Sequence, residues 1–299
     1  MSKIGTASED LTTGAIEGAA PPRQHIVETL IEERAAKLRA SRLWPAWRAV
    51  LYPLLRQPDA VRMVDAIAPL SGQGVLDHMS GVLDLEIAAS GLEHVPATGR
   101  VIIASTHPTG IADGIAMYDA LKRVREDLIF FANRDAIRVA PRLAEVVIPV
   151  EWVAEKRTRA RSRETLMSTV NAFSGDRCVV LFPSGRIAYK NDKGGLTEQP
   201  WLTSVALFAR KYECPVVPAH MTARNSWLYY WFWKINTELR DITLFNELLN
   251  KRRKRFEIRF GQAVMPGDLP ADPAAAAEML RRHAAYEAPA GEPWRAPAT

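Results

Sequence analysis

The chain has 299 residues, of which 47% are hydrophobic and 24% charged, and this composition is typical of a folded globular protein. No charge-free apolar stretch reaches the roughly 18 residues that a membrane-spanning helix needs, and the first twenty residues lack the features of a signal peptide. The formal net charge of +5 favours an anionic partner, which leaves phospholipids, nucleic acids and phosphorylated small molecules open.

From the sequence of the N-terminal part we expect a disordered stretch over residues 1–22 and a helical, membrane-associating lobe over residues 23–80. Val27, Leu30 and Ile31 recur at helical spacing, and Pro45 and Pro58 each fit the first turn of a further helix. The segment 43–56 combines aromatic, aliphatic and arginine side chains. We expect it to be an amphipathic helix, which either lies on a membrane surface or packs on the rest of the protein.

From about residue 82, short apolar runs that are typical of strands alternate with helical patterns. The expected strands are 83–88, 101–104, 128–132, 146–150, 178–182, 214–218 and 256–260, and the expected helices are 111–125, 134–144, 158–173, 200–211 and 239–253. This alternation predicts an α/β domain over residues 81–285, with a mixed, mostly parallel sheet flanked by helices. Residues 286–299 are rich in alanine and proline and are expected to form a flexible tail.

The segment around His107 and Asp113 is the most informative one for chemistry. His107 follows an apolar strand, and ligands of α/β sheets usually bind at this end of the strands. Asp113 falls in the first turn of the next helix, and the turn at Gly110 is expected to bring its carboxylate to the imidazole. Such a pair makes a general base, although two polar loop residues are an equally simple interpretation.

Two further turns leave predicted strands with polar or cationic groups. Ser184, Gly185 and Arg186 follow one strand, and a hydroxyl, backbone N–H groups and a guanidinium there suit a phosphate or a developing oxyanion. Arg224 comes after the expected strand 214–218, where it either binds a head-group phosphate or forms an ion pair with a structural carboxylate. A plain Pro-Gly turn with a solvated arginine also explains the first segment.

Together, a histidine and aspartate separated by five residues, a Phe-Pro-x-Gly block and a Val-Pro block resemble the 1-acylglycerol-3-phosphate acyltransferase superfamily over roughly residues 80–265. The wide His107–Asp113 spacing is most similar to the hemolysin-like and ornithine-lipid O-acyltransferase branch. More common members have four intervening residues, and a glutamate where this chain has Ser184.

The resemblance implies that His107 is the base, that Asp113 orients it, and that residues 182–186 line the acceptor site. A basic residue near Arg134 would contact the acceptor phosphate, although a solvated helix face explains this arginine as well. The donor would be acyl-CoA or an acyl carrier protein thioester, with no metal or other cofactor. The acceptor would be a lyso-lipid, either a lyso-aminolipid or lysophosphatidic acid, and Ser184 is the reason for leaving both open.

Aromatic residues in two segments suit contact with a membrane or an acyl chain. Trp44 and Trp47 lie in the first segment, and Trp227, Tyr230 and Trp231 lie in the second. The aromatic residues of the second segment would equally well fill a core. The basic run 251–255 favours anionic lipid or the acidic surface of an acyl carrier protein, or is simply a solvated helix end. We therefore expect a monomeric peripheral protein on the cytoplasmic face of the cell membrane.

Competing functions lack their motifs. The sequence has no G-x-S-x-G elbow for a serine hydrolase, no H-E-x-x-H for a metalloenzyme, and no phosphate-binding P-loop. No nucleic-acid-binding motif occurs, so no nucleic-acid partner is expected. Cys178 and Cys214 are expected to be buried free thiols. A non-catalytic peripheral lipid-binding protein remains the alternative to the acyltransferase.

Overall fold

A seven-stranded sheet forms the centre of the protein, which is described here from a computed structural model covering residues 24–151 and 154–296. The expected disordered stretch 1–22 lies outside the described residues. The strands occur in the order β1-β9-β8-β2-β5-β3-β4, and all neighbours are parallel except β8 and β9. Their bounds are β1 Glu86–Ser90, β2 Val101–Ser105, β3 Leu128–Asn133, β4 Val147–Val150, β5 Cys178–Leu181, β8 Val216–Thr222 and β9 Arg255–Phe260. The predicted α/β class with a mostly parallel sheet is confirmed.

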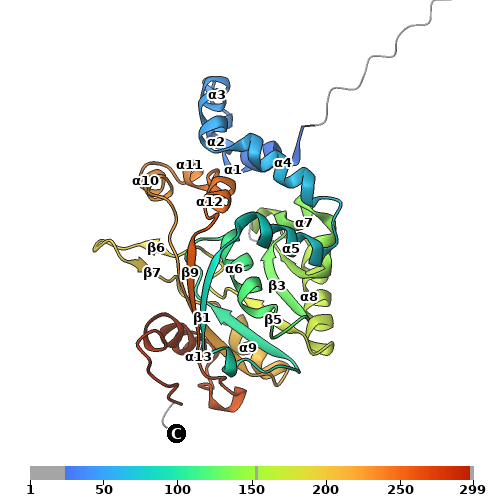
Figure 1. The fold of residues 1–299 in the computed structure, drawn as a ribbon, viewed down its shortest axis with the longest axis vertical. Coiled ribbons are helices and arrows are strands. Elements are labelled where there is room, and N and C mark those ends of the chain that lie inside the picture. Colours follow the sequence, from blue (N-terminus) through green and yellow to red (C-terminus); the bar gives the residue numbers. More distant parts are fainter. Residues whose placement is uncertain (1–23, 152–153, 297–299) are drawn as a thin grey trace, which may run out of the picture.

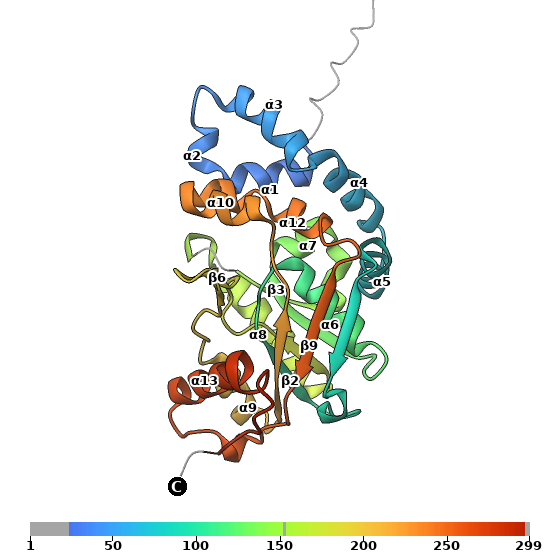
Figure 2. The same cartoon turned by 60° about the vertical axis from the view of Figure 1, so that its left-hand side comes forward.

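Helices cover both faces of the sheet (Figures 1 and 2). The helices of the α/β part are α6 Ile111–Leu121, α7 Asp135–Val139, α8 Arg159–Ser174, α9 Ser204–Lys211, α10 Trp227–Ile235, α11 Thr237–Asp241, α12 Leu244–Leu249 and α13 Pro273–Arg282. Of these, α10, α11 and α12 lie beyond one end of the sheet, beside the N-terminal helices (Figures 1 and 2). Because side chains alternate along a strand, Val101 and Ile103 of β2 join one apolar core, whereas Ile102 and Ala104 join the other. This two-sided burial explains why the strand is apolar throughout.

The parallel arrangement decides where the functional loops meet. Strand β2 pairs with β5 through Ala104 and Leu181, and with β8 through Ser105 and Ala219. The loops after these three strands therefore leave the same edge of the sheet, as parallel strands require. A short hairpin of β6 Tyr189–Lys190 and β7 Leu196–Thr197 follows β5.

Five helices precede the sheet: α1 Ile26–Arg34, α2 Ala36–Arg39, α3 Trp44–Leu54, α4 Gln57–Ile67 and α5 Gly72–Leu83. Helix α1 buries Val27 and Leu30, and α4 buries Met63 and Val64. Helix α3 stands out at the end of the molecule, above α10 (Figures 1 and 2). No helix among residues 24–151 and 154–296 is both long and apolar enough to cross a membrane.

Several predicted elements differ in extent from those observed. The expected helix 134–144 is shortened to α7 because Pro141 starts a separate 3₁₀ turn, and the expected helix 239–253 divides into α11 and α12. The expected strand 83–88 starts later, since α5 continues to Leu83 and ends on a left-handed Asp84.

The expected flexible tail, which is described to residue 296, is held at several points, although most of residues 290–296 are exposed. Ala288 is buried, and the Trp294 ring lies edge-on to His283 with 5.3 Å between the ring centroids. Arg259 of β9 donates hydrogen bonds to the carbonyls of Ala288 and Pro289. Alanine-rich composition thus did not reveal the contacts that hold this segment against the sheet.

Candidate active site

His107 and Asp113 face each other between the end of β2 and the first turn of α6. His107 Nδ1 lies 2.9 Å from Asp113 Oδ2, and the Asp113 side chain is fully buried. The two groups are not in hydrogen-bond geometry, and Nδ1 has no hydrogen-bond partner among the described residues. Such contacts are often imperfectly aligned in unliganded enzymes and tighten when substrate binds. The contact expected from the sequence is therefore present, with the aspartate placed to orient the ring.

The loop itself fixes Asp113. The carboxylate accepts hydrogen bonds from the backbone N–H groups of Thr109 and Gly110 at 2.9 and 3.0 Å, and from the Thr109 hydroxyl. Gly110 has φ of 101°, and a Cβ there would lie 2.9 Å from Ile187 Cδ1. Only glycine adopts this backbone conformation without strain, so the residue at position 110 shapes the His107–Asp113 turn.

The other imidazole nitrogen of His107 is open. The ring stacks on Phe182 with 4.4 Å between centroids, and the His107 side chain is 17% exposed. No hydrogen-bond partner of Nε2 occurs among residues 24–151 and 154–296. With Nδ1 facing a carboxylate, we assign the proton to Nδ1, which leaves the Nε2 lone pair free to accept a proton. This is the arrangement that a general base needs.

A buried glutamate supports the His107 backbone and was not foreseen from the sequence. Glu198 accepts a hydrogen bond from the His107 N–H at 3.0 Å and one from the Trp201 indole at 3.1 Å. Burial raises the pKa of Glu198, and the two hydrogen bonds oppose this rise. Glu198 lies 91 positions after His107, just beyond the β6–β7 hairpin. No local motif marks it.

The predicted oxyanion turn after β5 is largely occupied by its own hydrogen bonds. Ser184 is buried and donates its hydroxyl to the Arg186 carbonyl at 2.9 Å, while the Gly185 N–H donates to the Phe182 carbonyl at 2.9 Å. Ser184 and the Gly185 N–H are therefore not free to bind an oxyanion in this conformation. The Arg186 side chain is exposed and has no ion pair within the described part of the chain.

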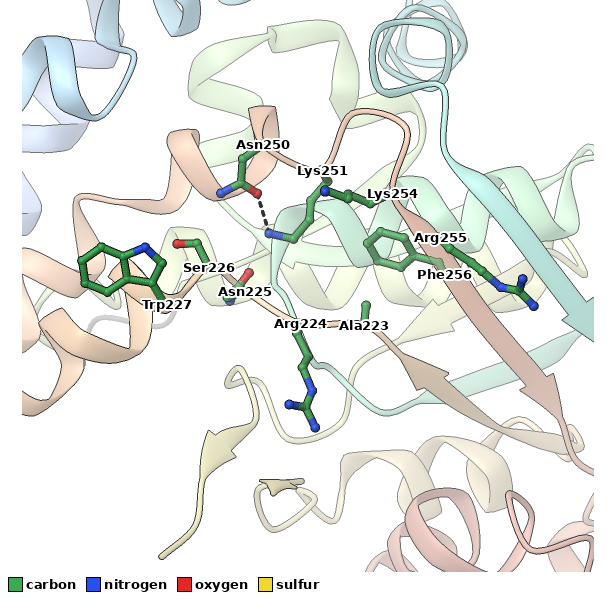
Figure 3. A pocket seen from close by; sticks show the side chains of 10 residues that line it. All are labelled: Ala223, Arg224, Asn225, Ser226, Trp227, Asn250, Lys251, Lys254, Arg255 and Phe256. Carbon is green, nitrogen blue, oxygen red and sulfur yellow. Dashed lines mark hydrogen bonds between the residues drawn. The ribbon is translucent and has the colours of Figure 1, made fainter. Parts of the chain in front are cut away.

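The structure separates the two other candidate arginines. Arg134 forms an ion pair with Glu164 at 2.7 Å, so this guanidinium already has a carboxylate partner. Arg224 instead lines an open pocket of about 480 Å³ beyond the end of β8 (Figure 3). Of the two, only Arg224 is therefore placed to meet a ligand.

The aromatic residues that were expected to contact a membrane or an acyl chain include both buried and exposed side chains. Trp44 is buried and Tyr230 is partly buried, with its hydroxyl accepting from the Asn225 N–H at 3.4 Å. Trp47, Trp227 and Trp231 are exposed, Trp227 at 74%. Trp44 is therefore a core residue rather than an interfacial one, a distinction that composition alone does not make, whereas contact of Tyr230 with a membrane or an acyl chain stays a prediction.

One protein family and several individual proteins are similar to this chain. Residues 86–222 match the Acyltransferase family. Two curated relatives, from Phocaeicola vulgatus and Bacteroides thetaiotaomicron, are named lyso-glycine lipid O-acyltransferase. They are 24% and 23% identical over 199 residues, which cover 64% of this chain and 69% and 71% of theirs. The crystal structure of the PlsC 1-acyl-sn-glycerophosphate acyltransferase from Thermotoga maritima aligns with a TM-score of 0.46 and 12% identity, over 87% of this chain and 94% of that one.

The family match and the names of the two relatives agree with the acyltransferase superfamily to which the motifs of this chain pointed. The matched residues 86–222 contain both His107 and Asp113 and end at the last residue of β8. Membership of the branch with five residues between the histidine and the aspartate stays a prediction.

Proposed function

We propose that this protein transfers a fatty acyl group from a thioester to the hydroxyl of a lyso-lipid with an amino-acid head group, as a step of membrane lipid synthesis. The observation that carries the proposal is the His107–Asp113 pair, with Nδ1 held at the carboxylate and Nε2 open. The names of the two curated relatives favour an aminolipid acceptor over lysophosphatidic acid.

The chemistry requires one base and one activated donor. The acceptor hydroxyl attacks the thioester carbonyl while His107 Nε2 removes its proton, and a C–O bond forms as the carbonyl becomes an oxyanion. The C–S bond then breaks, and the departing thiolate takes the proton back from the imidazolium. Asp113 stabilises the imidazolium between the two steps. Since a thioester is already activated, the donor is acyl-CoA or an acyl carrier protein thioester.

Arg186 is the group that we assign to the developing negative charge near the thioester carbonyl. Its guanidinium has no carboxylate partner in the described part of the chain and follows the same turn that supplies Phe182 to the His107 ring. A cation that reaches the reacting carbonyl favours the oxyanion more than the neutral carbonyl, which is the condition for lowering the barrier.

We further propose that the enzyme meets its lipid at the membrane surface through α3 and α10. On α3, Trp47, Val50 and Leu54 are exposed, and on α10, Trp227 and Trp231 are exposed. Both helices lie at the same end of the molecule (Figure 2). Exposed tryptophans beside aliphatic side chains are typical of interfacial binding. The expected location is peripheral, on the cytoplasmic face of the cell membrane.

Lipid analysis of a deletion strain tests the proposed function. We expect deletion to cause one lyso-aminolipid to accumulate, and wild type to reverse this, but not His107→Ala. Accumulation of lysophosphatidic acid would instead identify the other acceptor. If His107→Ala restored the lipid profile as fully as wild type, the protein would act by binding lipid without catalysis.

A further inference from the structure

The pocket beyond the end of β8 is basic and open to solvent (Figure 3). Its volume is about 480 Å³, and it is lined by Ala223, Arg224, Asn225, Ser226, Trp227, Asn250, Lys251, Lys254, Arg255 and Phe256. These residues come from the β8–α10 loop and from the turn between α12 and β9. None of the residues that line it is acidic.

Two of the cationic side chains that line the pocket have no carboxylate partner in the described part of the chain. Arg255 is paired with Glu86 and Glu257, and Lys251 is buried and donates to Glu247 and Asn250. By contrast, no carboxylate lies within ion-pair distance of Arg224 or Lys254 in residues 24–151 and 154–296. A concave site with two unneutralised cations attracts an anion.

Asn225 makes the pocket more specific. The residue is only 7% exposed, yet neither its side-chain oxygen nor its side-chain nitrogen has a hydrogen-bond partner among the described residues. Leaving such a buried group unpaired destabilises the folded protein. A ligand that offers both an N–H donor and a C=O acceptor would satisfy the two atoms together. A secondary amide offers this pair, and a phosphate ester has no N–H to give.

The base of the pocket is held rigidly. The Glu247 carboxylate accepts from Lys251 Nζ at 3.0 Å and from the Ser226 N–H at 2.8 Å, and both charged side chains are buried. Ser226 in turn caps α10 by accepting from the Tyr229 N–H. Arg224 and Asn225 therefore extend from a short loop anchored between β8 and a capped helix, and the N-terminus of α10 adds a favourable field for an anion.

The pocket is close to the proposed base. Strand β8 lies beside β2, and the Met221 N–H donates to the Thr106 hydroxyl at 2.8 Å, one residue before His107. Desolvation lowers the pKa of Lys251 in the pocket wall, and the charges of Glu247 and, to a smaller extent, Asp113 oppose this shift. A ligand anchored in the pocket can therefore extend toward the His107 ring.

We infer that this pocket binds the head group of an N-acyl amino acid acceptor, with the carboxylate on Arg224 and the adjoining amide on Asn225, while Lys254 adds positive charge to the pocket wall. An amino acid joined to a fatty acid through its nitrogen presents one carboxylate and one secondary amide. The hydroxyl of the same acyl chain then lies on the far side of the amide, toward His107. The inference rests on the proposed function and names the residues that select the acceptor.

Steady-state kinetics of purified variants test the assignment. The acceptor is an N-(3-hydroxyacyl)glycine in mixed micelles and the donor is a long-chain acyl-CoA or acyl carrier protein. We expect Arg224→Gln and Asn225→Leu each to raise the acceptor KM about 10- to 100-fold while kcat stays within about threefold, because they remove binding made before the transition state. The donor KM should not change. Arg123→Gln is the matched control, since Arg123 is an exposed arginine outside the pocket.

A second measurement separates binding from folding. Because Asn225 is buried without side-chain partners in the described part of the chain, Asn225→Leu should leave the thermal unfolding temperature unchanged or raise it. An acceptor with an ester in place of the amide keeps the carbonyl but loses the N–H, so wild type should bind it more weakly than the amide, whereas Asn225→Leu should bind the two acceptors equally. This comparison isolates the amide contact.

Three outcomes would overturn the inference. An unchanged acceptor KM in both variants would exclude the pocket as the head-group site. An increase only in the donor KM would assign the pocket to the phosphates or acidic surface of the donor. Equal losses with lysophosphatidic acid and the N-acyl glycine would show anion binding without amide recognition. In all three cases wild type still transfers acyl groups, so failure of the inference is distinct from failure of the proposed function.

Discussion

The buried carboxylate of Glu198 accepts a hydrogen bond from the backbone N–H of His107 at 3.0 Å. This contact joins the loop that carries the proposed base to the segment after the β6–β7 hairpin. The His107 carbonyl is also engaged, because it accepts from the Ala188 N–H at 2.8 Å. Both backbone groups of His107 are thus held by the region that follows β5, while its side chain remains free to act.

Replacing Glu198 should affect both stability and catalysis. Glu198→Ala leaves the His107 N–H and the Trp201 indole without their acceptor. We expect a loss of about 1–3 kcal/mol in the free energy of unfolding, measured by urea denaturation, together with a lower kcat. Glu126→Ala, at an exposed glutamate without an ion pair in the described residues, should change neither quantity. A Glu198→Ala enzyme with wild-type kcat would show that the backbone contact does not position the base.

Position 110 should tolerate only glycine. Gly110→Ala combines a φ of 101° with a Cβ that would lie 2.9 Å from Ile187 Cδ1, so we expect a destabilisation of about 1–3 kcal/mol. Gly114 lies in α6, where an added Cβ would meet no atom within 4 Å, so Gly114→Ala should instead stabilise by about 0.5–1 kcal/mol. The thermal unfolding temperatures of the two variants test this prediction. Equal changes in unfolding temperature for Gly110→Ala and Gly114→Ala would contradict the proposed strain at position 110.

The two thiols should be unreactive in the folded protein. Burial raises the pKa of both Cys178 and Cys214 to about 12, from an ordinary value of 9.0. Because the thiolate is the nucleophile, iodoacetamide at pH 8 should modify neither thiol until denaturant is added. Stability should also fall as the pH rises from 9 toward 12, since only the unfolded chain releases these protons readily. Rapid alkylation of the native protein would contradict the burial of these residues.

Membrane binding should depend on the exposed face of α3. Val50 is 65% exposed, and Val50→Asp places a charge where we expect contact with acyl chains. Less protein should then co-sediment with anionic phospholipid vesicles. Leu166→Asp is the matched control, because Leu166 is an exposed residue of α8, which lies away from α3 and α10 (Figure 1). If both variants bound vesicles as wild type does, α3 would not be the docking surface.

The sequence predicted central strands such as β2 and β5 well because they are buried on both faces and therefore read as continuous apolar runs. Strand β9 was recognisable from its alternation of exposed and buried positions. The turn holding His107 and Asp113 was also predictable, since only six positions separate the two residues. Glu198 was missed because its contact with His107 depends on the path of the hairpin between them.

Charge and composition were weaker guides than spacing. Arg134 and Arg224 both follow apolar strands, yet one pairs with Glu164 and the other has no ion pair in the described residues. Trp44 and Trp47 lie one turn apart on the same helix, and only the first is buried. Which partner an arginine finds, and which side of a helix meets the core, are decided by tertiary packing.

The most direct test of the central claim is the single-turnover rate of acyl transfer to a lyso-aminolipid by wild type, His107→Ala and Asp113→Asn. We expect His107→Ala to reduce the rate about 10²- to 10⁴-fold. Asp113→Asn should also reduce it, because the ring loses its carboxylate partner. Both variants should still bind vesicles, and far-ultraviolet circular dichroism should show a retained fold for His107→Ala. A correctly folded His107→Ala protein that transfers acyl groups at the wild-type rate would contradict the assignment of His107 as the base.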